Sequence, residues 1–128
     1  MRALLDSHAF LWWGTDDERL SSAARAAIVA GASELYVSVA SIWELAIKTQ
    51  KGDLVLPAEV GAFVDERLQR NRWISLSIDS RHVIRAAALP MIHRDPFDRM
   101  LVAQSQIEDL PIITTDAAIT RYDVETIW

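Results

Sequence analysis

The sequence lacks three features, each of which would define a class of protein. It has no cysteine, which excludes disulfide bonds and thiolate metal sites and fits a reducing compartment. It has no long apolar run at its N-terminus, because Asp6 interrupts the segment MRALLDSHAF. We therefore expect neither a signal peptide nor a membrane span, and we expect a cytoplasmic protein. It also has no repeat, linker or low-complexity segment.

The chain also lacks the excess of positive charge that is common in nucleic-acid-binding proteins, since its net charge is −5. This balance leaves room for a local basic patch, or for a metal ion that reverses the charge of an acidic site. The 128 residues are 51% hydrophobic and 24% charged, which predicts one globular domain over residues 1–128. The five tryptophans are many for this length, and some can serve a partner surface.

Short apolar segments alternate with helical patterns along the chain. We expect strands over 3–5, 35–38, 73–76 and 112–115, with 124–127 as a fifth. Helices are expected over 8–13, from Ser21 or Ser22 to Gly31, over 41–51 up to Gly52, from Pro57 to 71, from Asp79 to near Pro90, and from Asp95 to before Pro111. This alternation predicts an α/β fold in which helices cover both faces of a parallel sheet.

Four acidic residues from distant parts of the chain are expected at one edge of that sheet. Asp6 follows the first expected strand and Asp116 the fourth, and parallel sheets place their ligand sites at the carboxyl ends of strands. The stretch HRDPFDRMLV starts a helix at the same edge, with Asp95 as its cap and Asp98 in its first turn. Glu44 lies in the helix after the second strand, within ~9–10 Å of the edge.

Each of these acids also has a local explanation. Asp6, Asp98 and Asp116 can cap the helices or turns that follow them. Glu44 can pair with Lys48 on an exposed helix face. These local roles would leave the four acids without a common function.

The position of Asp98 argues for more than a cap. It shares a helix face with Leu101, Val102 and Ser105, whereas Arg99 and Gln106 lie on the other side. Two like charges 4 Å apart repel by roughly 4 kcal/mol at an effective dielectric near 20. Four gathered acids therefore need a cation or shifted protonation, and Mg²⁺ or Mn²⁺ fits an all-carboxylate site.

Five segments together resemble one known family. They are LLDSH, SVASIWELAIK, HRDPFDRMLVAQSQ, PIITTD and YDVETIW, and they resemble the PIN-domain ribonucleases, more narrowly the VapC toxins of type II toxin–antitoxin modules. The resemblance implies a three-layer α/β/α sandwich around a parallel sheet. It maps the acidic site residues of the family onto Asp6, Glu44, Asp98 and Asp116. Asp95 belongs to the motif too, and we keep it as the helix cap.

The resemblance implies cleavage of RNA phosphodiesters by metal-activated water, with Mg²⁺ or Mn²⁺ as cofactor. Asp6, Asp98 and Asp116 are the expected metal ligands, and Glu44 would ligate through water, help a second ion or orient the nucleophile. Hydroxyl groups near the site are expected from Ser7 and from Thr114 or Thr115. Side chains that can meet the RNA backbone, or else form a solvated helix end, are His93, Arg94, Arg99, Lys48 and Lys51.

The resemblance also implies protein partners. Family members are inhibited by a cognate VapB-type antitoxin whose C-terminal segment covers the active-site groove, and they form homodimers and larger complexes. Trp12, Trp13 and Trp43 are expected either at that contact or in the core.

Other protein classes fit the sequence less well. A response-regulator receiver needs a second acid after the first strand and a late lysine, but Ser7 and His8 follow Asp6 and no lysine follows Lys51. An aspartyl-nucleophile phosphatase needs an acid where His8 stands. A catalytically inactive binding module of the same fold, or a DNA-directed nuclease, remains as the alternative.

Overall fold

The structure is a computed structural model that describes residues 2–30 and 34–128. Its centre is a parallel sheet with the strand order β3-β2-β1-β4-β5. The strands are β1 (Ala3–Leu5), β2 (Leu35–Ser38), β3 (Ile74–Leu76), β4 (Ile112–Ile113) and β5 (Thr126–Ile127).

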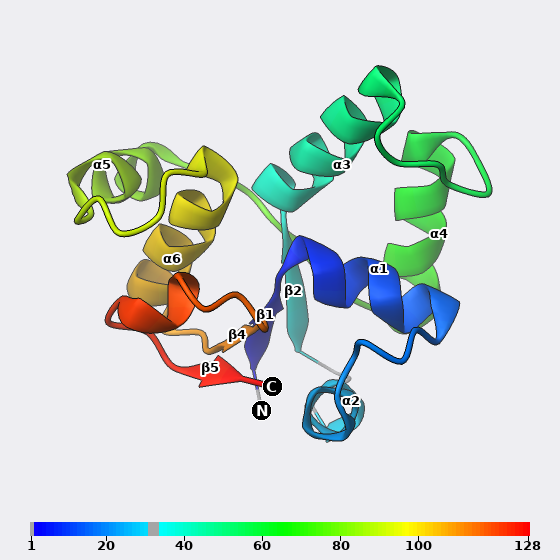
Figure 1. Cartoon of the computed structure of the whole chain (residues 1–128), viewed down its shortest axis with the longest axis horizontal. Coiled ribbons are helices and arrows are strands. Elements are labelled where there is room, and N and C mark those ends of the chain that lie inside the picture. The colour runs from blue at the N-terminus through cyan, green and yellow to red at the C-terminus, as the bar shows by residue number, and fades with distance from the viewer. Residues whose placement is uncertain (1, 31–33) are drawn as a thin grey trace.

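Helices cover both faces of the sheet (Figure 1). One side carries α1 (Ser7–Thr15), α2 (Ser22–Ala30), α3 (Val39–Lys51) and α4 (Val60–Asn71). The other carries α5 (Ser80–Ala88) and α6 (Pro96–Glu108), and a 3₁₀ turn, η1 (Ile119–Arg121), precedes β5. This arrangement confirms the α/β sandwich with a central parallel sheet that the sequence predicts.

The alternation of side chains along the strands builds a separate core on each face. In β1, Leu4 packs in the core under α5 and α6, while Leu5 packs in the core under α1 to α4. In β4, Ile112 and Ile113 divide in the same way and pair in register with Leu4 and Leu5. The middle of the sheet is therefore buried on both faces, which explains why its strands are continuous apolar runs.

The order of the strands creates a switch point beside β1. After β1 the chain moves outward through β2 and β3, and it then returns to the opposite side of β1 for β4 and β5. Ligands of open parallel sheets bind where the direction of winding reverses, at the carboxyl ends of the strands. Asp6 follows β1 and Asp116 lies three residues after β4, so these two acids flank the switch point.

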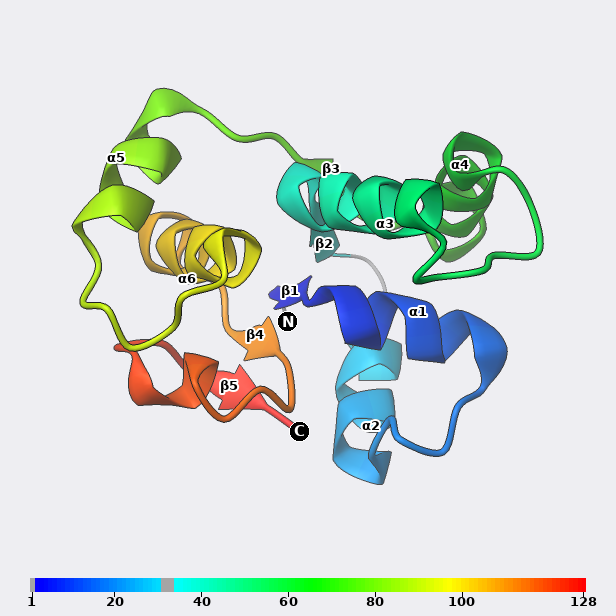
Figure 2. The ribbon, with the colours of Figure 1, turned by 45° about the horizontal axis from the view of Figure 1, so that its top comes forward.

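The starts of three helices meet near this edge. In the turned view the first turn of α1 lies between α3 and α6 (Figure 2). Helix α3 follows β2 directly, with the Ser38 hydroxyl accepting a hydrogen bond from the main-chain N–H of Ala40. It ends at Gly52, as predicted, where the left-handed φ of 81° suits a residue without a side chain.

Several predicted boundaries are wrong. Helix α1 runs over Ser7–Thr15 rather than 8–13, and α3 begins at Val39 rather than Ser41. The helix expected to open at Pro57 begins at Val60 because Glu59 caps it, accepting hydrogen bonds from the main-chain N–H groups of Gly61 and Ala62. The strand expected over 73–76 begins at Ile74, since Trp73 turns into the core beside Phe10.

Three smaller points complete the comparison. Strands β4 and β5 have two residues each and are shorter than the expected 112–115 and 124–127. The predicted helix end at Gly31 lies outside the described residues. None of the helices in the described ranges combines the length and hydrophobicity needed to cross a lipid bilayer.

Candidate active site

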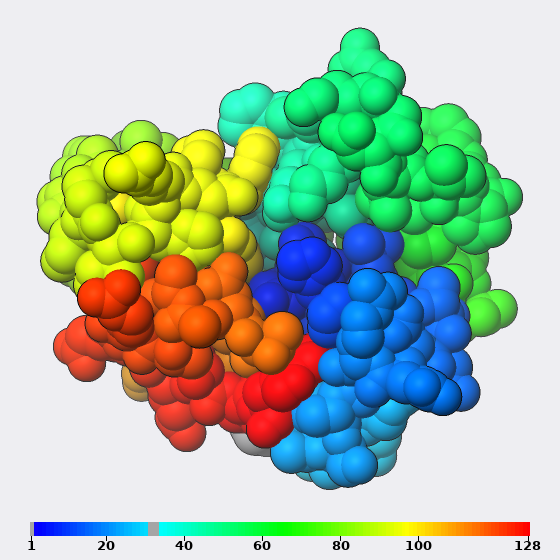
Figure 3. All heavy atoms as spheres, viewed as in Figure 1, coloured from blue at the N-terminus to red at the C-terminus, as the bar shows by residue number. Residues whose placement is uncertain are grey.

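A hollow opens on the face of the molecule where the carboxyl edge of the sheet lies (Figure 3). Its border is formed by the starts of α1, α3 and α6 and by the segment that follows β4. All four predicted acids belong to these elements, and each carboxylate is held by specific contacts.

Asp6 is both a helix cap and a buried member of the acidic site. Its Oδ1 accepts a hydrogen bond of 2.7 Å from the main-chain N–H of Ala9, so it caps α1. Its Oδ2 accepts a hydrogen bond of 2.6 Å from the hydroxyl of Thr114, which lies 108 positions away along the chain. Burial raises the pKa of Asp6, and the hydrogen bonds from Thr114 and Ala9 oppose that rise.

Asp116 is tied to the same hydroxyl. The Thr114 Oγ1 accepts a hydrogen bond from the main-chain N–H of Asp116, so one side chain links both acids across the switch point. Asp116 Oδ1 accepts from the N–H groups of Ala118 and Ile119 and thereby caps the turn before β5. Burial works to raise the pKa of Asp116, but hydrogen bonds from His93 and these N–H groups outweigh it, so the pKa is lowered.

Asp98 is a site acid whose ionised form is strongly disfavoured by its surroundings. It lies in the first turn of α6, where its side chain is 17% exposed, and Asp95 caps that helix by accepting from the N–H groups of Phe97 and Asp98. Burial raises the pKa of Asp98 to about 7, and the charges of Asp95 and Glu44 add to the rise. The low exposure of Asp98 itself agrees with the predicted inward lean, and Leu101, Val102 and Ser105 on the same helix face are buried.

Glu44 forms the expected ion pair with Lys48, but the pair does not lie on an exposed helix face, because Glu44 is buried. The Lys48 Nζ lies 3.0 Å from Glu44 Oε2, one helical turn away. Glu44 itself is only 7% exposed, because α3 turns this residue toward α6 and the sheet edge. Its charge acts on Asp98, so it belongs to the same acidic site.

His93 stands between two of the acids, a position that the sequence analysis missed. Its Nε2 hydrogen-bonds Asp116 Oδ2 at 3.1 Å and lies 3.0 Å from Asp98 Oδ2. Within the described ranges, the ligand atoms of these three residues form a cluster in which all lie within 4.8 Å of one another. The sequence held one signal for this position: His93 lies two residues before the helix cap Asp95, and therefore near the first turn of α6 that carries Asp98.

The expectation that Arg99 lies on a solvated side of its helix is wrong. Arg99 is buried, and its guanidinium donates to the carbonyl oxygens of Ala86, Leu89, Pro90 and His93. A buried guanidinium that is committed to main-chain oxygens cannot also reach an RNA backbone, so we withdraw it as a contact residue. Arg94 and Lys51 are exposed, and Lys48 is partly exposed.

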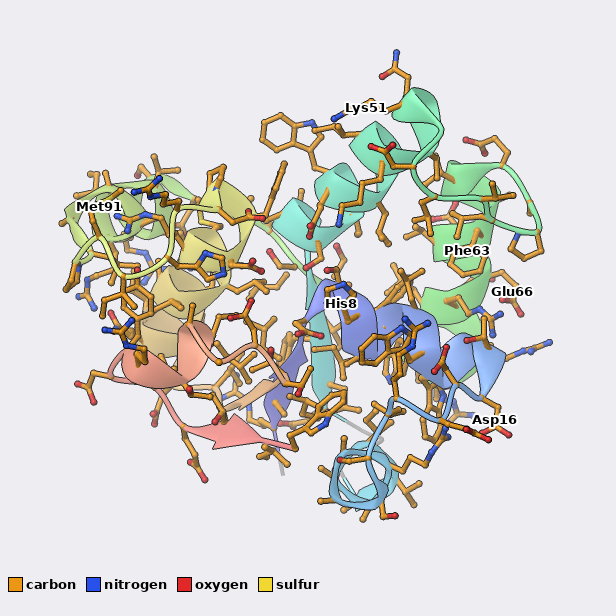
Figure 4. All side chains as sticks on the ribbon, viewed as in Figure 1. His8, Asp16, Lys51, Phe63, Glu66 and Met91 are labelled. Atoms are coloured by element: carbon orange, nitrogen blue, oxygen red, sulfur yellow. The ribbon has the colours of Figure 1, made fainter. Side chains whose placement is uncertain are left out.

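The structure distinguishes between the two threonines left open by the sequence. Thr114 is buried and bridges Asp6 to Asp116, whereas Thr115 is exposed. Ser7 is buried at the start of α1 and lines a cavity of about 480 Å³ between α1, α3 and the segment after α3. His8, on the side of α1 that faces α3, lines the same cavity (Figure 4).

The three tryptophans named above lie in different environments. Trp12 packs between His8 and Trp128, and the guanidinium of Arg19 lies over its ring. Trp13 packs against the core and donates from its indole nitrogen to Asn71. Trp43 is 61% exposed and touches Phe97 edge to face, with ring centroids 5.3 Å apart.

The donor set at this edge fits a hard divalent cation. Oxygen atoms of carboxylates are the ligands that Mg²⁺ and Mn²⁺ prefer, and several acids converge here in a half-buried place. Burial disfavours the ionised form of Asp98 and raises its pKa, and the charges of Asp95 and Glu44 add to that rise. A bound cation would favour the ionised form.

Comparison with known proteins identifies the family. Residues 3–125 match the PIN domain. The chain is 32% identical over 121 residues to Ribonuclease VapC22 of Mycobacterium tuberculosis (strain ATCC 25618 / H37Rv), across 93% of this chain and 90% of that protein. Its fold is similar to DNA-bound VapBC from Salmonella typhimurium, with a TM-score of 0.72, 17% identity, and 98% and 96% of the two chains covered. A toxin–antitoxin complex from Klebsiella pneumoniae gives a TM-score of 0.65 at 18% identity, with the same coverage.

The chain therefore belongs to the PIN domain family. Its likeness to the VapC-type members of that family, noted from five sequence segments, is confirmed by the match to a curated VapC over nearly the whole chain. The two solved structures have the same fold as this chain, at sequence identities of 17% and 18%.

Proposed function

We propose that this chain is a divalent-metal-dependent endoribonuclease and the toxin of a VapBC-type pair. The observation that supports the proposal is the cluster of Asp98, Asp116 and His93 near the switch point of the sheet, together with the electrostatic influence of Asp116 on Asp6 and of Glu44 on Asp98. The curated relative named as a ribonuclease supports the reaction. Like charges drawn together from remote segments repel one another, and a bound cation would relieve that repulsion.

Under this proposal Asp6, Asp98 and Asp116 hold Mg²⁺ or Mn²⁺, and Glu44 completes the site. A bound divalent cation would activate water and stabilise the charge on a phosphate. The protein's own contribution is to fix the carboxylates in advance. Thr114 and Ala9 orient Asp6, and the N–H groups before β5 orient Asp116, so little reorganisation is needed when substrate arrives.

The RNA backbone would meet the few cations near the hollow. Arg94 is exposed just before α6, and Lys48 extends from α3 beside Glu44 with its side chain 42% exposed. His93 lies deeper, against the acids. Because the whole chain carries a net charge of −5, these local cations and the metal must supply the attraction for phosphate.

The proposed protein partner is a VapB-type antitoxin. Trp43 is the most exposed of the three tryptophans and stands beside Glu44, so an inhibitory segment lying over the hollow would touch it. Trp12 lines the cavity between α1 and α3, which opens next to Ser7, and Trp13 packs behind it. We further propose that residues 1–128 act as one domain in the cytoplasm and assemble as a homodimer and in larger toxin–antitoxin complexes.

The experiment that tests the function is RNA cleavage by the purified chain in Mg²⁺ and in EDTA. The matched variants are Asp98→Asn, Asp6→Asn and, as a control on the exposed side of α4, Asp65→Asn. We expect cleavage by the wild type and by Asp65→Asn in Mg²⁺, at least a hundredfold less by the two site variants, and none in EDTA.

Two results would direct attention to the alternatives. Cleavage of single-stranded DNA but not of RNA would indicate a DNA-directed nuclease of the same fold. A folded wild type that cleaves neither nucleic acid would indicate an inactive binding module. Circular dichroism of each variant must match the wild type, so that loss of activity is not loss of folding.

A further inference from the structure

His93 lies at the centre of the acidic site although it is not one of the four acids. Its Nε2 lies 3.0 Å from Asp98 Oδ2 and 3.1 Å from Asp116 Oδ2, so the ring occupies the space between the two carboxylates. The side chain is only 17% exposed. A single ring nitrogen therefore links two acids, and the ligand atoms of all three residues lie within 4.8 Å of one another.

The other ring nitrogen determines where the proton lies. The main-chain N–H of Asp95 donates to His93 Nδ1 at 3.2 Å. A ring nitrogen that accepts a hydrogen bond carries no proton, so the proton of the neutral ring lies on Nε2. The N–H bond therefore faces the carboxylates of Asp98 and Asp116, and the cap of α6 sets this tautomer.

The main chain of His93 is anchored on both sides. Its N–H donates to the hydroxyl of Tyr122 at 2.8 Å, and its carbonyl oxygen accepts from Arg99 at 3.3 Å. The same guanidinium binds the carbonyl oxygens of Leu89 and Pro90, which begin the connection to His93. These buried and part-buried hydrogen bonds hold the main chain at His93 in place, in contrast to an exposed segment whose side chain happens to touch an acid.

From this geometry we propose that His93 is a positioning residue that takes the place of the metal ion in the metal-free protein. Its Nε2–H group holds the carboxylates of Asp98 and Asp116 together, and it gives way when a divalent cation binds. Mg²⁺ prefers oxygen ligands, and a proton-bearing nitrogen cannot share the space between two carboxylates with a cation. The inference rests on the proposed metal site and adds a residue that prepares it.

Two substitutions distinguish the loss of the Nε2–H donor from the loss of the imidazole ring. His93→Gln keeps an N–H group at about the reach of Nε2. His93→Asn is shorter, and its nitrogen stops near the position of Nδ1, so no donor lies between the acids. Thermal unfolding of the full chain at pH 8, first in EDTA and then in millimolar Mg²⁺, compares both variants with the wild type.

We expect His93→Asn to melt about 5 °C below the wild type in EDTA, as one lost hydrogen bond to a charged group predicts for a chain of this size. His93→Gln should melt close to the wild type. Added Mg²⁺ should raise the melting temperature of His93→Asn by about 5 °C more than that of the wild type, because no donor has to leave. Nitrogen-15 spectra of the metal-free wild type should show His93 protonated at Nε2, and Mg²⁺ should shift those signals.

Several results would overturn the inference. Equal melting temperatures of all three proteins in EDTA would mean that the donor supports nothing. A smaller Mg²⁺ effect in His93→Asn than in the wild type would make His93 a metal ligand instead, and ring signals unchanged at saturating Mg²⁺ would show that nothing is displaced. If Mg²⁺ stabilises none of the proteins, both the displacement of the His93 donor by Mg²⁺ and the proposed metal dependence are wrong. If Mg²⁺ stabilises the wild type more than His93→Asn, only the displacement is wrong and the metal dependence stands.

Discussion

At the scale of single residues, the site acids combine a local role with a shared one. Asp6 and Asp116 cap the elements that follow them and also bind Thr114 and His93, respectively. Local patterns in the sequence predict the caps, which is why each acid alone looked ordinary. The hydroxyl bridge and the imidazole between the acids could not be predicted, because they join residues whose separation in the sequence says nothing about side-chain contact.

The first prediction concerns the stability of the metal-free protein as pH changes. The pKa of Asp98 rises from its ordinary value of 3.8 to about 7 on folding, because burial and the charges of Asp95 and Glu44 disfavour its ionised form. Between about pH 4 and 7 the folded protein keeps a proton that the unfolded chain has lost. The free energy of unfolding in EDTA should therefore fall across this window as pH rises, by about 2–4 kcal/mol.

Asp98→Asn should remove the part of this loss that comes from Asp98, while Asp6, whose pKa is also raised, keeps its own part. In EDTA the variant should therefore be more stable than the wild type at pH 8. Urea unfolding at pH 5 and pH 8 measures the difference. The same experiment on Asp65→Asn, an exposed acid outside the site, should reproduce the wild-type behaviour. If Asp98→Asn loses as much stability between the two pH values as the wild type does, Asp98 is not a source of this loss.

The second prediction concerns Thr114. Its hydroxyl donates to Asp6 and accepts from the N–H of Asp116, and both bonds are lost in Thr114→Val, which has nearly the same shape. We expect a loss of about 1–3 kcal/mol in the free energy of unfolding, since a buried carboxylate is left short of a donor. Thr115→Val, at the exposed neighbouring position, is the matched control in urea unfolding. Equal stabilities of the two variants would contradict the bridge.

At the scale of the elements, helix α6 organises one side of the site. Asp95 starts it, Asp98 lies in its first turn, and Arg99 ties its start to the end of α5. The cap and the proline at the helix start were evident in the sequence, and both are confirmed. The predicted exposure of Arg99 was wrong because the connection that follows α5 covers the side of α6 opposite its apolar face. Helical periodicity cannot show that connection.

The third prediction tests the role of Arg99 in holding this connection. Arg99→Met keeps the apolar stem but removes the guanidinium that donates to the carbonyl oxygens of Ala86 and Leu89, and Leu89 loses its charged donor. We expect the free energy of unfolding to fall by about 2–4 kcal/mol, as for other losses of a buried charged donor. Arg94→Met, at an exposed position five residues earlier, should change it by less than about 0.5 kcal/mol. A variant Arg99→Met as stable as Arg94→Met would rule out a structural clamp.

At the scale of the whole molecule, the order of the strands determines where the chemistry can occur. Alternating strands and helices predicted a parallel sheet, and counting strands placed Asp6, Asp98 and Asp116 at one edge. The order β3-β2-β1-β4-β5 was not predictable, because no local pattern records which strands become neighbours. That order brings the ends of β1 and β4 side by side and so joins the first and last acids of the site.

Under the proposed function, the sheet edge is also the place where an acidic chain would attract RNA. The negative charge of the candidate site is gathered where a cation can neutralise it, and Lys48 is a positive side chain beside Glu44. Metal binding should thus do two things at once: relieve the repulsion among the acids and make the hollow attractive to phosphate. Both effects depend on all the acids contributing to a single site.

The measurement that most directly tests whether these acids form one metal site is a calorimetric titration of the purified chain with Mn²⁺. The same titration is made with Asp6→Asn and Asp98→Asn, which change acids from distant parts of the chain, and with Asp65→Asn as control. A single shared site predicts that the wild type and the control bind Mn²⁺ alike, while each site variant binds at least tenfold more weakly and stays folded. Wild-type affinity in either folded site variant would show that these acids only cap helices, and the account of one metal site at the sheet edge would be wrong.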